Sequence, residues 1–421
     1  MDLTDLDRFN PWWKTGKVKA DLLKDYKRKL YPKISEYVDK RQILLIQGLR
    51  RVGKTIIMFQ LIQNQLKKTK SANILYFSFD EVAYDLKEVL KTYQEIILGK
   101  TFENTKEKIY LFLDEIQKVE DWENKLKVLY DLYPNLKIFI SGSSSINLRK
   151  NSRESLAGRL FSFILPPLEF DEFLELNGMD IKKIKAKPEL WKNEILPMFH
   201  RYAKFGGFPE LATEKNEKFA RDYILNSVIE KIIYKDIPEE FNVKEPDLLK
   251  RLLYIVGKKP GMIINFKDIG RNLGRDERTI ANYFEYLEQS MLVKFVFNYR
   301  TSPIATMRKL KKVYFNTPNL IFALNYSELM PEVLENVVAV KLDAKYFYRN
   351  SYEVDFIKEN GELSAIEVKL EAKKLKQLKK LGSDKSFLRK IKKKYIVDIE
   401  KECVEEGIKI IPIWKFLLDI E

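Results

Sequence analysis

The feature that most constrains this chain is the segment Gly48–Thr55, which reads Gly-Leu-Arg-Arg-Val-Gly-Lys-Thr. It matches the G-x-x-x-x-G-K-[ST] pattern of phosphate-binding loops in full. An apolar run at Ile43–Gln47 precedes the loop, and an apolar helical pattern at Ile56–Leu66 follows it. A loop of this kind has to join a strand to a helix, because the helix N-terminus faces the phosphates. The segment therefore predicts an α/β domain that binds ATP.

Each part of the loop has a chemical role. Its glycines allow backbone N–H groups to curl around phosphate oxygens. The lysine should contact the β- and γ-phosphates, and Thr55 should ligate Mg²⁺. The predicted ATP-binding residues are Gly48, Arg50, Arg51, Gly53, Lys54 and Thr55.

A second motif follows at the distance expected for the same site. The apolar run Ile109–Asp114 ends in two carboxylates, Asp114 and Glu115. We expect Asp114 to hold the Mg²⁺ ion and Glu115 to polarise the attacking water. Acidic residues often end strands for other reasons, so this motif gains its meaning from the loop upstream.

The region from 43 to 165 alternates apolar runs with helical patterns, which indicates a parallel sheet with helical crossovers. The expected strands are Ile43–Gln47, Asn73–Phe79, Ile109–Asp114, Leu136–Ser141 and Phe161–Leu165.

Composition limits the classes of function. A chain of 421 residues should contain two to four domains, and its net charge of +15 favours a polyanionic partner, nucleic acid or an acidic membrane surface. No apolar run is long enough to span a bilayer, and the acidic, polar start carries no secretory signal, which predicts a cytoplasmic protein without a membrane partner. Cys403 and His200 are the only residues of their types, which excludes an internal disulfide and histidine-rich metal sites. We interpret His200 as structural.

The segment 247–300 contains two short helical patterns, Phe266–Leu273 and Glu277–Gln289, and then an apolar stretch, Met291–Tyr299, that suggests a small hairpin. This arrangement resembles a winged helix-turn-helix. Arg275 and Arg278 would then project from the second helix toward DNA. A purely structural lid is the alternative.

The C-terminal region has the element order αβββαβ. The expected elements are a helix at Pro331–Ala344, strands at Tyr346–Arg349, Tyr352–Lys358 and Leu363–Leu370, a lysine-rich helix at Lys373–Gly382 and a strand at Lys394–Val397.

Three charged residues of these strands suggest a metal site. Side chains two apart on a strand share a face, so Glu367 and Lys369 should point together, with Asp355 beside them on the neighbouring strand. Two carboxylates can bind Mg²⁺ or Mn²⁺, and a nearby ammonium can activate water. Alternating Glu-x-Lys strands are also common on solvated sheet faces. The lysine-rich helix, with Lys373 and Lys374, suits contacts to DNA phosphates, and a solvated helix face is the alternative.

These motifs together resemble prokaryotic AAA+ P-loop ATPases whose C-terminal part carries a restriction-endonuclease-like domain. The resemblance covers most of the chain. It rests on the segments already described and on Asn10–Trp13, Leu113–Gln117, Ser141–Ser144, Ala157–Arg159 and Gly206–Pro209.

The resemblance implies several further roles. Ser143, or Ser144, would sense the γ-phosphate, and a helix N-cap is the alternative. Arg159, with Arg153 in reserve, would be an arginine finger donated to a neighbouring subunit of a homo-oligomer; a surface salt bridge is the alternative. Glu335 would be an additional acidic metal ligand of the nuclease-like site.

The predicted organisation has four parts. They are an N-terminal clasp and nucleotide-binding domain at 1–167, a helical lid at 168–246, a winged-helix-like domain at 247–300 and a restriction-endonuclease-like domain at 301–421. We expect an ATP-hydrolysing protein that processes DNA, with a Mg²⁺-dependent endonuclease activity in its C-terminal domain that acts on branched DNA. The alternative is a nucleotide-dependent signalling switch that binds protein partners and whose nuclease-like domain is silent.

Overall fold

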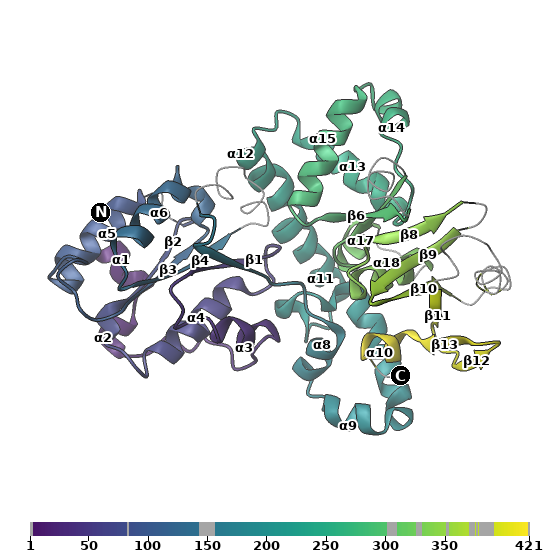
Figure 1. The fold of residues 1–421 in the computed structure, drawn as a ribbon, viewed down its shortest axis with the longest axis horizontal. Coiled ribbons are helices and arrows are strands. Elements are labelled where there is room, and N and C mark those ends of the chain that lie inside the picture. Colours follow the sequence, from purple (N-terminus) through teal and green to yellow (C-terminus); the bar gives the residue numbers. More distant parts are fainter. Residues whose placement is uncertain are drawn as a thin grey trace. The chain divides into compact units, whose positions relative to one another are not determined.

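The computed structural model describes residues 3–81, 84–142, 156–300, 310–325, 331–350, 353–369, 375, 378 and 391–419. The chain divides into two compact units, Met1–Pro166 and Pro167–Glu421, each with its own sheet (Figure 1). The first boundary predicted from the sequence, at residue 167, coincides with this division.

The front unit contains a five-stranded parallel sheet in the order β2-β3-β4-β1-β5. Its strands are β1 Ile43–Gln47, β2 Ile74–Ser78, β3 Ile109–Asp114, β4 Leu136–Gly142 and β5 Leu160–Ile164. The four inner or covered strands are buried along their whole length, whereas β5 is largely exposed. The predicted parallel α/β sheet is therefore confirmed.

Helices flank this sheet. They are α1 Leu3–Phe9, α2 Trp12–Thr15, α3 Leu30–Ser35, α4 Lys54–Gln65, α5 Leu86–Thr92 and α6 Trp122–Leu132. Figure 1 shows α4 below the strands and α5 and α6 above them in that view. Shorter turns of helix lie at Ser71–Asn73, Tyr93–Leu98 and Ile116–Lys118.

The N-terminal residues clasp the edge strand β2. Asn10 is fully buried; its side chain accepts from the Tyr76 N–H at 2.7 Å and donates to the Tyr76 carbonyl at 2.9 Å. The indoles of Trp12 and Trp13 both donate to the carbonyl of Ile74. Side chains thus satisfy backbone groups that a further strand would otherwise bind.

The back unit begins with helices and ends in a second sheet. Its helices are α8 Phe170–Leu176, α9 Ile181–Ala186, α10 Lys192–Arg201, α11 Glu217–Ile224, α12 Ile237–Phe241, α13 Pro246–Lys258, α14 Phe266–Leu273, α15 Glu277–Gln289, α17 Asn319–Asn325, α18 Pro331–Lys341 and α20 Ile413–Leu417. Short 3-10 or π-helical stretches lie at Pro188–Trp191, Tyr202–Gly206, Pro209–Leu211, Leu225–Ile229 and Ile232–Asp236.

The second sheet has eight strands in the order β12-β13-β11-β10-β9-β8-β6-β7. They are β6 Val293–Asn298, β7 Lys311–Phe315, β8 Tyr346–Arg349, β9 Glu353–Asn360, β10 Glu362–Val368, β11 Ile391–Asp398, β12 Cys403–Glu405 and β13 Ile408–Pro412. The stretch Met291–Tyr299 contains one strand rather than the predicted hairpin. Because β6 pairs with both β7 and β8, this stretch is part of the large sheet.

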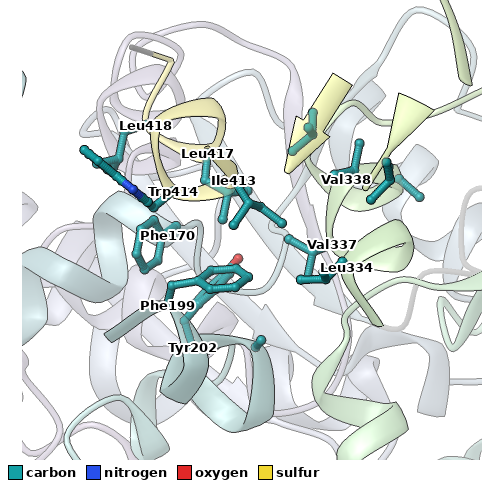
Figure 2. Packing of buried hydrophobic residues seen from close by; sticks show 14 of the residues in the cluster. Phe170, Phe199, Tyr202, Leu334, Val337, Val338, Ile413, Trp414, Leu417 and Leu418 are labelled. Carbon is teal, nitrogen blue, oxygen red and sulfur yellow. The ribbon is translucent and has the colours of Figure 1, made fainter. Parts of the chain in front are cut away.

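One apolar core joins the helices to this sheet. Figure 2 shows Phe170, Phe199 and Tyr202 near Trp414, with Val337 and Val338 of α18 opposite. All of these side chains are buried, and Trp414 is 1% exposed. This shared core contains residues from all three segments predicted in the back unit, 168–246, 247–300 and 301–421. The division of the back unit into three domains stays a prediction.

Candidate nucleotide site and a second carboxylate centre

The carboxyl ends of β1, β3 and β4 bring the predicted ATPase residues together. Asp114 at the end of β3 is buried, and three hydroxyl groups donate to it. Thr55 Oγ1 lies 2.7 Å from Asp114 Oδ2, Tyr76 Oη lies 2.9 Å from the same oxygen, and Ser141 donates to Oδ1. Because parallel strands end at one edge of a sheet, residues far apart in sequence form one centre here.

The loop before α4 has the shape that a phosphate group requires. Gly53 has φ +99°, a conformation that residues with side chains rarely adopt. A Cβ atom on Gly48 would collide with the carbonyl of Leu165, so only glycine fits there. Lys54 donates to the carbonyls of Gly48 and Leu49 at 3.0 Å each. Its ammonium is thereby held inside the loop.

The charge state of Asp114 follows from its surroundings. Burial raises the pKa of the Asp114 carboxyl above its ordinary value, and the nearby Glu115 raises it further, although three hydroxyl donors oppose this. Burial likewise raises the pKa of Tyr76 well above its usual range. The donors to Asp114 from the described residues are neutral hydroxyl groups, and a cation beside the carboxylate would favour its charged form. Asp114 and Thr55 therefore fit a Mg²⁺ ion.

Glu115 occupies a restrained position beside this centre. Its φ is +53°, a left-handed conformation that costs energy in residues other than glycine and that often occurs at functional sites. Its N–H donates to Ser141 Oγ at 3.2 Å, and its carboxylate accepts from the Gln117 amide. The carboxylate is also 3.9 Å from Lys54 Nζ. The backbone thus fixes the direction of the predicted water-polarising group.

Two arginines of the loop, predicted to bind ATP, have different surroundings from one another. Arg50 lies 3.7 Å from Asp80, and Arg51 is exposed with φ +66°. No sequence motif marks Arg28, which is buried and donates to the carbonyls of Val52 and Pro166 at 2.8 Å each. Arg28 therefore ties the loop to the end of the front unit.

The predicted γ-phosphate sensor and arginine finger have separate outcomes. Ser143, Ser144 and Arg153 lie outside the described residues. Within the described part, Ser141 is the serine of this strand that contacts the centre. Arg159 donates to both carboxylate oxygens of Asp131 on α6, at 2.8 and 3.1 Å, which is the surface salt bridge considered as its alternative.

A second buried carboxylate centre lies in the back unit. Lys312 of β7 is 4% exposed, and its Nζ lies 2.7 Å from Glu353 Oε1, 3.2 Å from Glu335 Oε1 and 4.0 Å from Asp355 Oδ1. Burial lowers the pKa of Lys312, but the three carboxylates outweigh this and raise it overall. The hydroxyl of Tyr314 also donates to Glu335 at 2.5 Å. Sequence reasoning missed Lys312, because no local motif connects it with its partners. Two of these partners are on β9, the third strand from β7 in the sheet, and Glu335 is on α18.

The predicted Glu367–Lys369 pair does not share a strand face, so this expectation was wrong. Strand β10 ends at Val368, and Lys369 follows with φ +68°, exposed, with its N–H bonded to the carbonyl of Val397. A left-handed residue interrupts the alternation on which the prediction depended.

The other acidic residues of this region divide between two places. Glu367 is buried and shares its face of β10 with Ala365, whereas Ile366 lies in the core beside α18. Asp355 accepts from the Val368 N–H at 2.9 Å and faces Lys312, as does Glu335. Among described residues, no three acidic, histidine or cysteine side chains are grouped so as to hold a metal ion.

The predicted DNA contacts lie at the start of α15 or outside the described part. Asp276 caps α15 by accepting from the Thr279 N–H. Arg275 pairs with Glu245 at 2.7 Å, while Arg278 is exposed. Lys373 and Lys374 are outside the described residues.

Comparison with known protein families identifies the front unit. A family model described as an AAA domain matches residues 40–174, which contain the loop, Asp114 and Glu115. A second model, described as a domain of unknown function, matches residues 196–328. The nucleotide centre thus lies in a P-loop ATPase domain of the AAA class.

Two curated proteins of Methanocaldococcus jannaschii, both described as uncharacterized, match nearly the whole chain. One is 31% identical over 424 residues, which are 90% of this chain and 88% of the relative. The other is 31% identical over 432 residues, with 92% and 88% covered. The protein belongs to their family. An uncharacterized protein of Haemophilus influenzae is 28% identical to this family member over 61% of the chain and 62% of the relative.

Solved structures that match this chain include the Aeropyrum pernix Orc1 protein in complex with DNA, at 14% identity and a TM-score of 0.34, with 75% of this chain and 96% of that chain covered. The Cdc6p protein of Pyrobaculum aerophilum matches at 13% identity and a TM-score of 0.32, over 76% and 98%. No helix in the described part of this AAA ATPase is both long and apolar enough to cross a membrane.

Proposed function

We propose that this AAA ATPase binds ATP with Mg²⁺, hydrolyses it at the Asp114 centre and uses the cycle to act on DNA. The observation that carries the proposal is the meeting of Lys54, Thr55, Asp114 and Glu115 at one edge of the parallel sheet. Mg²⁺, when bound, supplies charge neutralisation at the phosphates.

Residues of the chain would bind the phosphates, hold the cation and activate the water. The loop backbone from Gly48 to Thr55 binds the phosphate oxygens, and Lys54 orients the terminal phosphates. Thr55 and Asp114 hold the cation, while Ser141 and Tyr76 fix the Asp114 carboxylate by hydrogen bonds. Glu115 orients the attacking water and accepts its proton.

Lys54→Ala tests the site. We expect ATP hydrolysis to be abolished, because the ammonium contacts the phosphates where negative charge develops. Lys67→Ala is the matched control, since Lys67 is an exposed lysine just beyond α4. Glu115→Gln should retain ATP binding and lose turnover. Undiminished turnover in Lys54→Ala would disprove the assignment.

The DNA part of the proposal is supported by charge. The net charge is +15, and Arg278 lies exposed in the first turn of a helix whose neighbour α14 completes a helix-turn-helix-like pair. Fluorescence anisotropy with labelled duplex DNA over a salt series would measure binding. Affinity should fall steeply with salt, because phosphate contacts release counterions. Absence of binding at low salt would favour the signalling switch.

A second candidate activity is Mg²⁺-dependent DNA cleavage by the C-terminal region, as the restriction-endonuclease-like resemblance implies. The supporting observations are the order α18, β8, β9, β10 and the burial of Asp355 and Glu367 on adjacent strands. The ion pairs of Lys312 favour the silent alternative, because an internal cation already offsets part of the negative charge of the carboxylates facing it.

Cleavage of labelled duplex and four-way-junction DNA, with Mg²⁺ or Mn²⁺ and with or without ATP, would separate these two candidates. Wild type would be compared with Glu367→Ala and with Glu359→Ala, whose carboxylate is exposed on β9. Cleavage lost only in Glu367→Ala would establish a nuclease. Absence of cleavage by wild type under all conditions would leave an ATPase whose C-terminal region has a binding role.

A further inference from the structure

A hollow of about 660 Å³ opens on the sheet of the back unit. Its wall contains five lysines from three strands: Lys358 of β9, Lys392, Lys393 and Lys394 of β11, and Lys409 of β13. We call this feature the lysine hollow. Its size is that of a site for a ligand of many atoms, larger than a single phosphate ion needs.

The charges of the lysine hollow are largely uncompensated. Lys392 pairs with Glu362 at 2.9 Å, and the other carboxylate of the wall, Asp419, is already paired with Lys341 at 2.8 Å. Among the described residues, none of the other four lysines of the wall has a carboxylate within ion-pair distance, although Lys393 is near enough to Glu362 to help lower the pKa of that carboxyl. Burial also lowers the pKa of Lys394, which adds to the cost of leaving these ammonium groups without an anion.

A break in strand pairing concentrates these lysines. Neighbouring side chains of a regular strand point to opposite faces. Here Leu363 is opposite Ile391 but Ser364 is opposite Lys393, so Lys392 is an extra residue in β11. A bulge of this kind re-aims the side chain of the extra residue, and Lys392 lines the same hollow as its neighbour Lys393. The local backbone is thus shaped around a cluster of positive charge.

The wall also contains two half-buried aromatic rings, Tyr395 of β11 and Phe416 of α20. Aromatic rings stack on bases of any sequence, but only where the bases are unpaired. No arginine lines the hollow, so the planar bidentate contact that reads guanine or clamps one phosphate is absent from its described wall.

We propose that the lysine hollow binds a short stretch of single-stranded DNA, with the lysines on its phosphates and the rings beside its bases. This inference rests on the proposed action on DNA, and it names the surface and the form of DNA. Lys358 of β9 and Ser364 of β10, which line the hollow, are opposite one another in the sheet. Asp355 and Glu367 lie farther along the same two strands, so the hollow is on the strands that carry these carboxylates.

Anisotropy with a labelled oligo(dT) about 12 nucleotides long would test the proposal. Lys393→Glu/Lys409→Glu should weaken binding about tenfold or more at low salt and reduce the salt slope by about 1.4, because each single-strand phosphate contact contributes about 0.7. Lys345→Glu/Lys401→Glu is the control, with the same change of charge at exposed positions outside the hollow. Melting temperature and ATP turnover would verify that both variants are folded.

Each outcome decides between the proposals. Loss of binding confined to the hollow variant would support the inference, and Tyr395→Leu should then weaken binding about fivefold. Equal weakening in both double variants would overturn it, since general charge would suffice. If wild type binds duplex but no single strand, the hollow proposal fails while the DNA function stands. If wild type binds neither form, both proposals fail.

Discussion

The two carboxylate centres of this protein differ in the charge of the groups that contact their buried carboxylates. Asp114 in the front unit receives only neutral hydroxyl donors, from Thr55, Tyr76 and Ser141. In the back unit, Asp355 shares its surroundings with the ammonium of Lys312, which also pairs with Glu335 and Glu353. A charge that is buried in a protein is stabilised by a partner of opposite sign. The second centre contains such a partner, the ammonium of Lys312, whereas the described donors to Asp114 carry no charge.

The comparison suggests what each centre is for. Under the proposed function, the Asp114 carboxylate, which accepts from neutral hydroxyl groups, would bind the cation that arrives with the nucleotide. A carboxylate cluster with its own lysine stabilises the fold, and any metal ion there would have to compete with that lysine. The following predictions test this difference, from the largest expected effect to the smallest.

Lys312→Met should destabilise the back unit by about 3–5 kcal/mol, because it leaves the buried Asp355 and the half-buried Glu335 and Glu353 without their cation. Urea unfolding measures this, and Lys312→Met/Glu335→Gln should recover part of the loss. The pKa of Lys312 is raised in the folded protein. Where the carboxylates are ionised, its contribution should therefore be fully present below about 10.4, the ordinary lysine value, and be lost as the pH rises through the raised pKa of the folded protein. A Lys312→Met protein as stable as wild type would remove the distinction between the centres.

Asp114→Asn should reduce ATP turnover at least about 100-fold, because a metal ion held there supplies several kcal/mol of charge stabilisation. Its stability at neutral pH should be equal or higher, since burial disfavours the carboxylate and raises its pKa. Asp355→Asn is the matched change in the other centre and should leave ATP turnover unaltered. A steady-state ATPase assay and thermal melting measure both effects; a stability loss in Asp114→Asn would contradict the comparison.

Tyr76→Phe should reduce ATP turnover about fivefold, because one of the three hydroxyl donors that orient Asp114 is removed. Tyr110→Phe on the adjacent strand is the control, since its ring is buried and its hydroxyl donates to no described carboxylate. Equal turnover in wild type and Tyr76→Phe would show that two hydroxyl groups suffice.

Arg159→Ala distinguishes an arginine finger from a surface salt bridge. If the exposed pair with Asp131 is the only role of Arg159, the melting temperature and the ATP turnover should both stay within error of wild type. A large loss of turnover without a change in melting would instead support donation to a neighbouring subunit, and Asp131→Ala would serve as the control.

Local sequence signals predicted the helices and strands better than they predicted the carboxylate centre around Lys312. The strands Ile43–Gln47 and Ile109–Asp114 and the helices Phe266–Leu273 and Glu277–Gln289 have the predicted bounds, because apolar runs, glycines and caps mark their ends. The nucleotide centre was predictable since its motifs have fixed spacing. Lys312 was not, because its partners come from α18 and β9 through folding of the sheet.

Backbone geometry accounts for other differences. The left-handed conformation of Lys369 and the extra residue at Lys392 depend on strand pairing, and alternation in the sequence cannot reveal them. The contact of Ser141 with Asp114 also depends on folding, because it joins the ends of β4 and β3; the predicted sensor at Ser143 or Ser144 stays a prediction, since both residues lie outside the described part.

The clasp of Asn10, Trp12 and Trp13 has a consequence for how this protein can be handled. These side chains use backbone groups of β2, an edge of the front sheet. Removing the first thirteen residues would leave a flat apolar strand with open hydrogen-bonding groups, which is a template for another chain. A shortened protein should therefore self-associate on concentration, and a purification tag is better placed at the other end of the chain.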